Sequence, residues 1–219
     1  MTAALGFGVS GPLAMRWHPA REARALIEQA IAGGVAHFDT APFYGEGEGE
    51  RRLGEAIAAH GGRLFISTKT GTRRRGRRII KDFSERAIRA DVEGSLKRLG
   101  RERIDTLYLH GPRREEIDAS IGVLDSLVAE GKAAFWGVCG EGPTLGHAVK
   151  AGAGAVMGSY NVVDRRHEAI FREAHARGVV VTAIAPLAQA LFLRGPGEVR
   201  GAADFWRLAR AAARPRQRA

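Results

Sequence analysis

Cysteine is nearly absent from the 219-residue sequence, because Cys139 is the only one. An internal disulfide framework is therefore excluded. Long apolar runs are missing too: no window approaches the roughly 18 uninterrupted apolar residues that a membrane-spanning helix needs. The first ten residues also lack a basic region leading an apolar one, which is the pattern of a secretory signal. We expect a cytoplasmic protein without a membrane segment.

Metal-ligand spacing is also missing. None of the 7 histidines stands at a spacing from acidic residues or cysteine that is typical of a metal site. The sequence therefore predicts no bound metal.

Positive charge, by contrast, is abundant: 34 Lys and Arg stand against 24 Asp and Glu, for a formal net charge of +10. Much of the excess lies in two clusters, RRRGRR at 73–78 and the tail at 207–219. Neither cluster carries interleaved aromatics in a recognisable nucleic-acid-binding motif, so nucleic acid is an unfavoured partner. We interpret both mainly as solvated surface charge, with binding of a phosphorylated ligand as the alternative.

Short apolar runs alternate with longer stretches whose apolar residues recur every three or four positions, the pattern of βα units. With 45% hydrophobic side chains, the chain can bury one core, and we expect one domain over 1–219. The expected strands are 4–9, 36–39, 64–69, 104–110, 134–138, 155–160 and 179–185. The expected helices are 19–32, 48–59, 84–99, 117–128, 144–151, 166–177 and 202–213.

Repeated strand-then-helix order implies parallel strands joined by right-handed crossovers. A closed barrel and an open doubly wound sheet both satisfy that order, and periodicity does not separate them. In a barrel, chemistry gathers at the carboxyl ends of the strands.

Four ionisable side chains stand at or just after those ends: Asp39, Tyr44, Lys69 and His110. Any one of them alone is more often a paired structural group than a catalyst. Together they suit one reaction, because an ammonium lowers the pKa of a nearby phenol and a carboxylate holds the ammonium charged. The phenol could then protonate a carbonyl oxygen that an imidazole orients, while a cofactor supplies hydride.

The strings around these residues resemble the aldo-keto reductase family. HFDTAPFYGEGEGERRLGEAI at 37–57 resembles the segment that carries the family's aspartate and tyrosine, and FISTKTG at 65–71 resembles its lysine strand. SLKRLGRERIDTLYLHGP at 95–112 resembles the helix, turn and strand that end in its histidine. Similarity in matching order runs from about residue 5 to about residue 193.

The resemblance implies a TIM-type (β/α)8 barrel in which Tyr44 is the general acid, Lys69 lowers its pKa, Asp39 supports Lys69 and His110 positions the carbonyl. It implies NADPH as cofactor, with NADH as an alternative, bound without a Rossmann glycine loop. The glycines in GEGEG at 45–49 are therefore read as shaping a turn. The implied cofactor-binding positions are Ser10, Asp39, Cys139, Met157, Tyr160, Ile184, Pro186, Leu187 and Gln189.

Three of these positions depart from the family's usual residues. Cys139 stands where serine and asparagine often hold the nicotinamide amide, and Met157 where a glutamine commonly does so. Ile184 stands where an aromatic often stacks on the nicotinamide ring. Cys139 and Met157 also fit simple core packing.

Family members usually continue past the point where this sequence stops, through an eighth strand and the cluster that grips the adenosine 2′-phosphate. We therefore expect an incomplete barrel of about seven βα units. Its open seam has unpaired backbone edges, which a terminal segment or a second chain, in a homo-oligomer or with a partner, could fill. A degenerate remnant with weakened cofactor binding is the third outcome.

The leading hypothesis is an NADPH-dependent reductase of a small-molecule aldehyde or ketone. Two alternatives stay open: a cofactor-independent lyase, isomerase or dehydratase using Tyr44 and Lys69, and a non-catalytic partner subunit.

Overall fold

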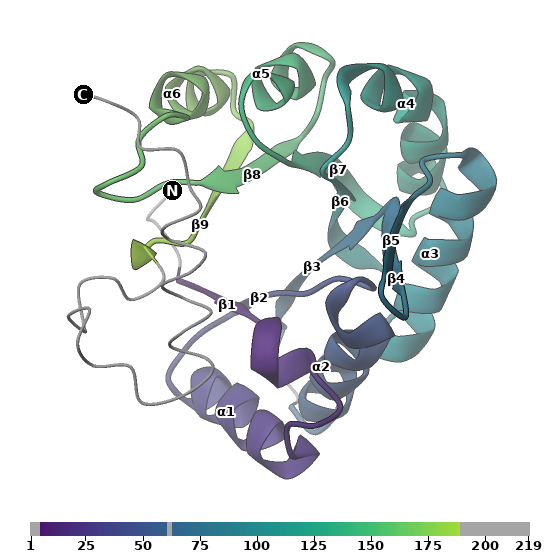
Figure 1. Ribbon diagram of the computed structural model, residues 1–219, viewed down its shortest axis with the longest axis vertical. Coiled ribbons are helices and arrows are strands. Elements are labelled where there is room, and N and C mark those ends of the chain that lie inside the picture. Colours follow the sequence, from purple (N-terminus) through teal and green to yellow (C-terminus); the bar gives the residue numbers. More distant parts are fainter. Residues whose placement is uncertain (1–4, 61–62, 189–219) are drawn as a thin grey trace.

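The computed structural model describes residues 5–60 and 63–188, in which strands and helices alternate (Figure 1). The parallel strands are β1 (Gly6–Gly8), β2 (His37–Asp39), β3 (Phe65–Thr70), β6 (Ile104–His110), β7 (Ala133–Cys139), β8 (Ala155–Ser159) and β9 (Val180–Ile184). The helices are α1 (Ala20–Ala32), α2 (Glu48–Ala58), α3 (Glu85–Leu99), α4 (Arg114–Ala129), α5 (Pro143–Lys150) and α6 (Glu168–Ala176). The seven predicted strands are confirmed, and the helix expected at 202–213 lies outside the described residues.

The strands form one sheet in the order β1-β2-β3-β6-β7-β8-β9, with every neighbouring pair parallel. The sheet curls around an axis close to the viewing direction of Figure 1, and the helices cover its outer face. This is an incomplete (β/α)8 barrel, so the closed-barrel alternative of the sequence analysis is confirmed in its shortened form. Within the described residues β1 and β9 are the two edges, and the filling of the seam between them stays a prediction.

Local sequence sets the helix ends where the pattern predicts them. The Ser84 hydroxyl accepts a 3.3 Å hydrogen bond from the amide of Ala87 at the start of α3. Gly100 ends that helix with φ of 62°, a left-handed conformation that glycine adopts without strain.

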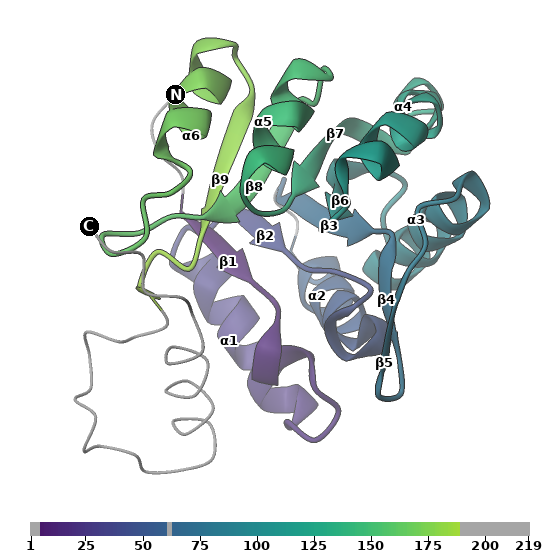
Figure 2. The same ribbon diagram turned by 45° about the horizontal axis from the view of Figure 1, so that its top comes forward.

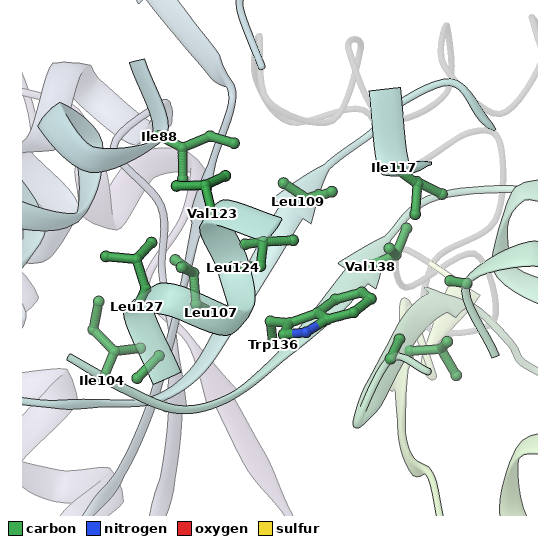
Figure 3. Close-up of a cluster of buried hydrophobic side chains, with 14 of the residues drawn as sticks. Ile88, Ile104, Leu107, Leu109, Ile117, Val123, Leu124, Leu127, Trp136 and Val138 are labelled. Atoms are coloured by element: carbon green, nitrogen blue, oxygen red, sulfur yellow. The ribbon is translucent and has the colours of Figure 1, made fainter. Parts of the chain in front are cut away.

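The main hydrophobic core lies between the sheet and the outer helices. Leu107, Leu109 and Val138 project outward from β6 and β7 against Ile117 and Leu124 of α4 (Figure 3). This arrangement fixes the alternation of the strands, so the intervening residues point into the barrel. A smaller buried cluster fills that interior: Tyr108, Cys139, Ala155 and Met157, with Phe135, Val180 and Ile184 packed against them.

Strand register brings the candidate residues to one end of the barrel. Asp39 pairs with Ser67 two residues before Lys69, Lys69 pairs with Tyr108, and His110 pairs with Cys139. The carboxyl ends of β2, β3, β6 and β7 therefore form one mouth.

A feature that the sequence analysis did not predict is a β-hairpin directly after β3. Strands β4 (Thr72–Arg75) and β5 (Arg78–Lys81) pair antiparallel around Gly76, whose φ is 58°. The basic cluster 73–78 lies on this hairpin. The run of arginines hid the alternation of residues typical of strands. The glycine at position 76, which can adopt the left-handed conformation of a hairpin turn, was the available signal in the sequence.

Among the described residues no helix is both long enough and apolar enough to cross a membrane. The same part of the chain contains no group of three or more His, Cys, Asp and Glu side chains placed to hold a metal ion.

Candidate functional site

A buried ion pair lies at the centre of the barrel mouth. The Lys69 ammonium donates to Oδ2 of Asp39 at 2.5 Å and to the backbone oxygen of Thr40 at 2.8 Å. The Lys69 side chain is 1% exposed and that of Asp39 is 18% exposed. Burial alone would lower the pKa of Lys69, but Asp39 and Tyr44 outweigh it and hold that pKa above its usual value. Lys69 is therefore charged at neutral pH.

A tight turn at Tyr44–Gly47 carries the tyrosine over this pair. Gly45 has φ of 64° and Gly47 has φ of 90°. A Cβ atom on Gly45 would lie 1.7 Å from the backbone oxygen of Ala14, so only glycine fits there. These glycines shape the turn that presents Tyr44, as the sequence analysis interpreted them.

The Tyr44 ring contacts both other candidates. Its centroid lies 5.1 Å from the Lys69 nitrogen and 6.0 Å from the centroid of the His110 ring, which it meets edge to face. The four residues singled out in the sequence, Asp39, Tyr44, Lys69 and His110, therefore converge at one place and are called the quartet below. Asp39 holds Lys69, Lys69 lies against the phenol ring, and His110 lies beside it.

The pKa of Tyr44 differs from the simple expectation. Burial raises it above 10, and Lys69 opposes that rise without overcoming it. Lys69 thus acts in the expected direction, but desolvation of the phenolate is the larger effect. The consequence is that Tyr44 holds its proton at neutral pH, which is the state that a proton donor needs.

His110 is neutral at the mouth. Burial, with the positive charges of Lys69 and Lys81, lowers its pKa to about 3. Its Nδ1 atom is buried and has no hydrogen-bond partner within the described part of the chain. A neutral imidazole donates from one ring nitrogen and accepts at the other, and the tautomer decides which of the two roles the nitrogen facing a bound molecule takes.

Sequence reasoning missed a second row of polar groups below Asp39 and Lys69. The Ser67 hydroxyl donates to Oδ1 of Asp39 at 2.8 Å, and Nε2 of His37 lies 3.0 Å from the same hydroxyl. Both residues stand two positions before a candidate on the same strand, so the strand period places them on the same inward face. That spacing was the signal available in the sequence.

The predicted cofactor positions Cys139, Met157 and Ile184 lie in one cluster: Cys139 ends β7, Met157 pairs with it from the middle of β8, and Ile184 ends β9. Cys139 and Met157 are buried in the interior cluster and Ile184 packs against it. Burial raises the pKa of the Cys139 thiol to about 11, so the thiol is protonated and unreactive at neutral pH. These side chains make an apolar floor on one side of the mouth.

The remaining predicted cofactor positions are more scattered. Ser10 follows β1, Pro186 follows β9, and Leu187 beside it is 67% exposed. The structure does not bring Tyr160 to the mouth: its ring packs 5.9 Å from that of Phe171 of α6, in the outer core. The alternation of β8 turns it outward. Gln189 lies outside the described residues.

The hairpin β4–β5 lies beside the mouth, next to the ends of β3 and β6. Thr72 donates to the backbone oxygen of His110 at 2.6 Å, and Lys81 donates to that of Gly111 at 2.5 Å. At the tip, the amide of Gly76 donates to Oε1 of Glu46 at 3.0 Å. These bonds tie the hairpin to the Tyr44 turn and to the end of β6.

Comparison with known proteins agrees with this geometry. The chain is 36% identical over 135 residues to a D-threo-aldose 1-dehydrogenase from a Pseudomonas species, covering 50% of this chain and 41% of that enzyme. The chain spans between 41% and 66% of the length of the first curated relatives that it matches.

Solved structures resemble the fold over most of the chain. The holo form of an aldo-keto reductase from Bacillus halodurans superposes with a TM-score of 0.79 at 27% identity, covering 97% of this chain and 74% of that one. An aldo-keto reductase from Klebsiella pneumoniae, in complex with NADP and acetate, shares the fold with a TM-score of 0.72 at 24% identity, covering 95% and 72% of the two chains.

The sequence strings, the curled barrel and the quartet at its mouth point the same way. The family model described as "Aldo/keto reductase family" matches residues 4–203, which include every strand of the sheet and all four quartet residues. The chain therefore belongs to the aldo/keto reductase family of oxidoreductases.

Proposed function

We propose that the protein reduces an aldehyde or ketone to an alcohol, with NADPH as the preferred hydride donor and NADH as the alternative. In this proposal Tyr44 donates the proton. The observation that carries the proposal is the convergence of Tyr44, Lys69 and His110 at one point of the mouth, with Lys69 held by Asp39 at 2.5 Å.

Each residue has a distinct task in this proposal. Tyr44 gives its proton to the carbonyl oxygen as that oxygen gains charge. The Lys69 ammonium stabilises the phenolate that is left behind, and it offsets the desolvation that otherwise keeps the phenol protonated. His110 holds the carbonyl oxygen by a hydrogen bond from its neutral ring. Asp39 keeps Lys69 charged and in place.

The described residues also fit the reactive half of the cofactor. Cys139, Met157 and Ile184 form an apolar floor that suits a flat nicotinamide ring. Ser159, which pairs with Ile184 on β9, donates from its hydroxyl to Glu141 at 2.9 Å, and a carboxylate at this position would accept a hydrogen bond from a carboxamide. When bound there, the reduced nicotinamide supplies the hydride.

Support for a nicotinamide cofactor comes from the fold. The Klebsiella aldo-keto reductase, whose fold this chain shares, is solved in complex with NADP, and the relatives named above are reductases or dehydrogenases. Sugar aldehydes are one substrate class that such relatives suggest.

The test is NADPH oxidation with a panel of aldehydes, followed by absorbance, for the natural chain and for Tyr44→Phe. We expect Tyr44→Phe to lower kcat at least about a hundredfold with little change in the cofactor Kd, since it removes only the proton donor. Tyr160→Phe is the matched control, because it deletes a phenol hydroxyl on the outer side of the sheet. Unchanged turnover in Tyr44→Phe would reject Tyr44 as the acid.

Cofactor binding is measured separately by quenching of tryptophan fluorescence. No saturable quenching up to millimolar NADPH or NADH would reject the reductase proposal and favour a cofactor-independent or non-catalytic role.

A further inference from the structure

The hairpin β4–β5 carries a guanidinium that lies over an aromatic ring of the mouth. The Arg74 guanidinium carbon lies 5.2 Å from the centroid of the Phe43 ring. Phe43 in turn meets the His110 ring edge to face at 5.7 Å and the Tyr44 ring at 6.1 Å. One aromatic ring therefore separates the positive charge of Arg74 from the groups proposed to bind the carbonyl.

The position of Arg74 is set by its neighbours. Cross-strand pairing places Arg74 opposite Ile79 and Thr72 opposite Lys81, and these two pairs share one face of the hairpin. Thr72 and Lys81 both bond to the end of β6 beside His110. The face that carries Arg74 is therefore the face turned to the mouth.

The Arg74 side chain has no carboxylate partner among the residues that the structure describes. The structure shows no ion pair for Arg74 within the described part of the chain, whereas its neighbour Arg73 pairs with Asp91 at 2.5 Å. The nearest carboxylate on the facing turn, Glu46, accepts from the amide of Gly76. A guanidinium held over an aromatic ring keeps its N–H donors, which can bind an anion.

The nicotinamide ring does not account for this charge. Figures 1 and 2 place β4–β5 on the β3 side of the mouth, across from the ends of β8 and β9. The apolar floor proposed for the nicotinamide is built by Cys139, Met157 and Ile184 of β7, β8 and β9. A molecule bound between Tyr44 and the hairpin therefore occupies the substrate side.

We propose that Arg74 is a specificity-determining residue that selects carbonyl substrates bearing a carboxylate or phosphate away from the carbonyl group. This inference rests on the proposed reductase function and names its substrate class. The anion binds the Arg74 guanidinium while the carbonyl oxygen reaches Tyr44 and His110, and an apolar or aromatic spacer lies along Phe43. The exposed Arg75, Arg77 and Arg78 add a positive field that attracts such anions to the mouth.

The experiment compares matched substrates that differ in charge. For a carboxylate, 4-formylbenzoate is compared with its methyl ester; for a phosphate, 4-formylphenyl phosphate is compared with 4-methoxybenzaldehyde. Values of kcat and KM are measured with the natural chain, Arg74→Gln, Arg74→Lys and Arg77→Gln. Arg77→Gln is the control, since it removes the same charge from the exposed hairpin tip.

We expect Arg74→Gln to lower kcat/KM for the anionic aldehydes roughly tenfold or more, mainly through KM, because a charged hydrogen bond is lost. The neutral aldehydes should change less than about twofold, and Arg77→Gln should affect all four by less than about twofold at physiological salt. Arg74→Lys should restore part of the loss, more for phosphate than for carboxylate, because a point charge suits phosphate better than it suits the bidentate geometry of a carboxylate.

Three results would overturn the assignment of Arg74. They are equal losses on charged and neutral aldehydes, a loss in Arg77→Gln as large as in Arg74→Gln, and a raised KM for NADPH in Arg74→Gln. In each case the reductase proposal stands, because the neutral aldehydes are still reduced. If the natural chain reduces none of the four aldehydes but reduces others of the aldehyde panel, the assignment of Arg74 fails and the reductase proposal stands; if it reduces no aldehyde at all, both proposals fail.

Discussion

The Ser67 hydroxyl donates a 2.8 Å hydrogen bond to Oδ1 of Asp39, the carboxylate oxygen that Lys69 does not use. A carboxylate only accepts, so the single hydroxyl proton of Ser67 points to Asp39. Nε2 of His37, 3.0 Å from the same hydroxyl, must then carry a proton and donate it. Burial lowers the pKa of His37, which agrees with a neutral ring protonated at Nε2 alone. Each oxygen of Asp39 therefore accepts a hydrogen bond, one from Ser67 and one from Lys69.

Replacing Ser67 by Ala is expected to loosen Asp39 without removing any group of the quartet. The free energy of unfolding should fall by about 1–3 kcal/mol, because Oδ1 of Asp39 and Nε2 of His37 lose their buried partner. Turnover should fall less than in Tyr44→Phe, through poorer placement of Lys69. Urea unfolding and kcat measure the two effects.

Thr106 supplies the matched control for this change. It is fully buried on β6 at the position that pairs with Ser67, and its hydroxyl has no hydrogen-bond partner among the described residues. Thr106→Val should therefore leave stability unchanged or raise it. A loss in Thr106→Val equal to that in Ser67→Ala would show that the Ser67 effect is one of packing and not of the bond to Asp39.

The pH dependence of turnover follows from two shifted groups. Burial raises the pKa of Tyr44 above 10, and burial with Lys69 and Lys81 lowers that of His110 to about 3. Tyr44 must be protonated to donate and His110 neutral to bind the carbonyl, so kcat/KM for reduction should be flat between roughly pH 5 and pH 9. A pH profile with a neutral aldehyde checks this. An acid limb near pH 6.5 would mean that His110 titrates as in water.

His110 should also make the fold sensitive to acid. Its pKa is about 3 when folded against 6.5 as the ordinary value. The unfolded chain therefore takes up a proton between these values while the folded chain does not, and stability is lost as the pH falls through that window. Between pH 7 and pH 4, His110→Asn should lose about 3 kcal/mol less unfolding free energy than the natural chain. His37 is present in both proteins, so its own contribution cancels.

The meeting of the quartet residues at one end of the sheet follows from the strand pattern, while the choice of a barrel and the role of each residue came from the family resemblance. Asp39, Lys69 and His110 each end or nearly end an apolar run, and parallel strands bring such ends together. The effect of burial on the pKa of Tyr44 could not be predicted from the sequence, because it depends on how much water the folded mouth excludes. The hairpin was missed because the five arginines in 73–78 were interpreted as solvated charge. Its role depends on the bonds of Thr72 and Lys81 to the end of β6, which join residues 38 and 30 positions apart in the sequence.

The ion pair between Asp39 and Lys69 can be tested for coupling by a double-mutant cycle. Asp39→Asn leaves a buried ammonium without its counter-charge, and Lys69→Met leaves a carboxylate held only by Ser67. We expect each single change to cost about 3 kcal/mol of unfolding free energy, and the double variant to be less destabilised than the sum by about 2 kcal/mol. All three variants should lose carbonyl reduction.

The pH response of Asp39→Asn gives an independent check on the same pair. Asp39 is the strongest group that raises the pKa of Lys69 against burial. Without it, burial dominates and the folded pKa drops below the ordinary 10.5. A depressed folded pKa means that the folded chain binds fewer protons than the unfolded chain, so the stability of Asp39→Asn should rise as the pH is raised toward 10.5. The natural chain should show no such rise. Additive single effects together with a flat pH response in Asp39→Asn would mean that Lys69 does not depend on Asp39 for its charge, and the task proposed for Asp39 would be wrong.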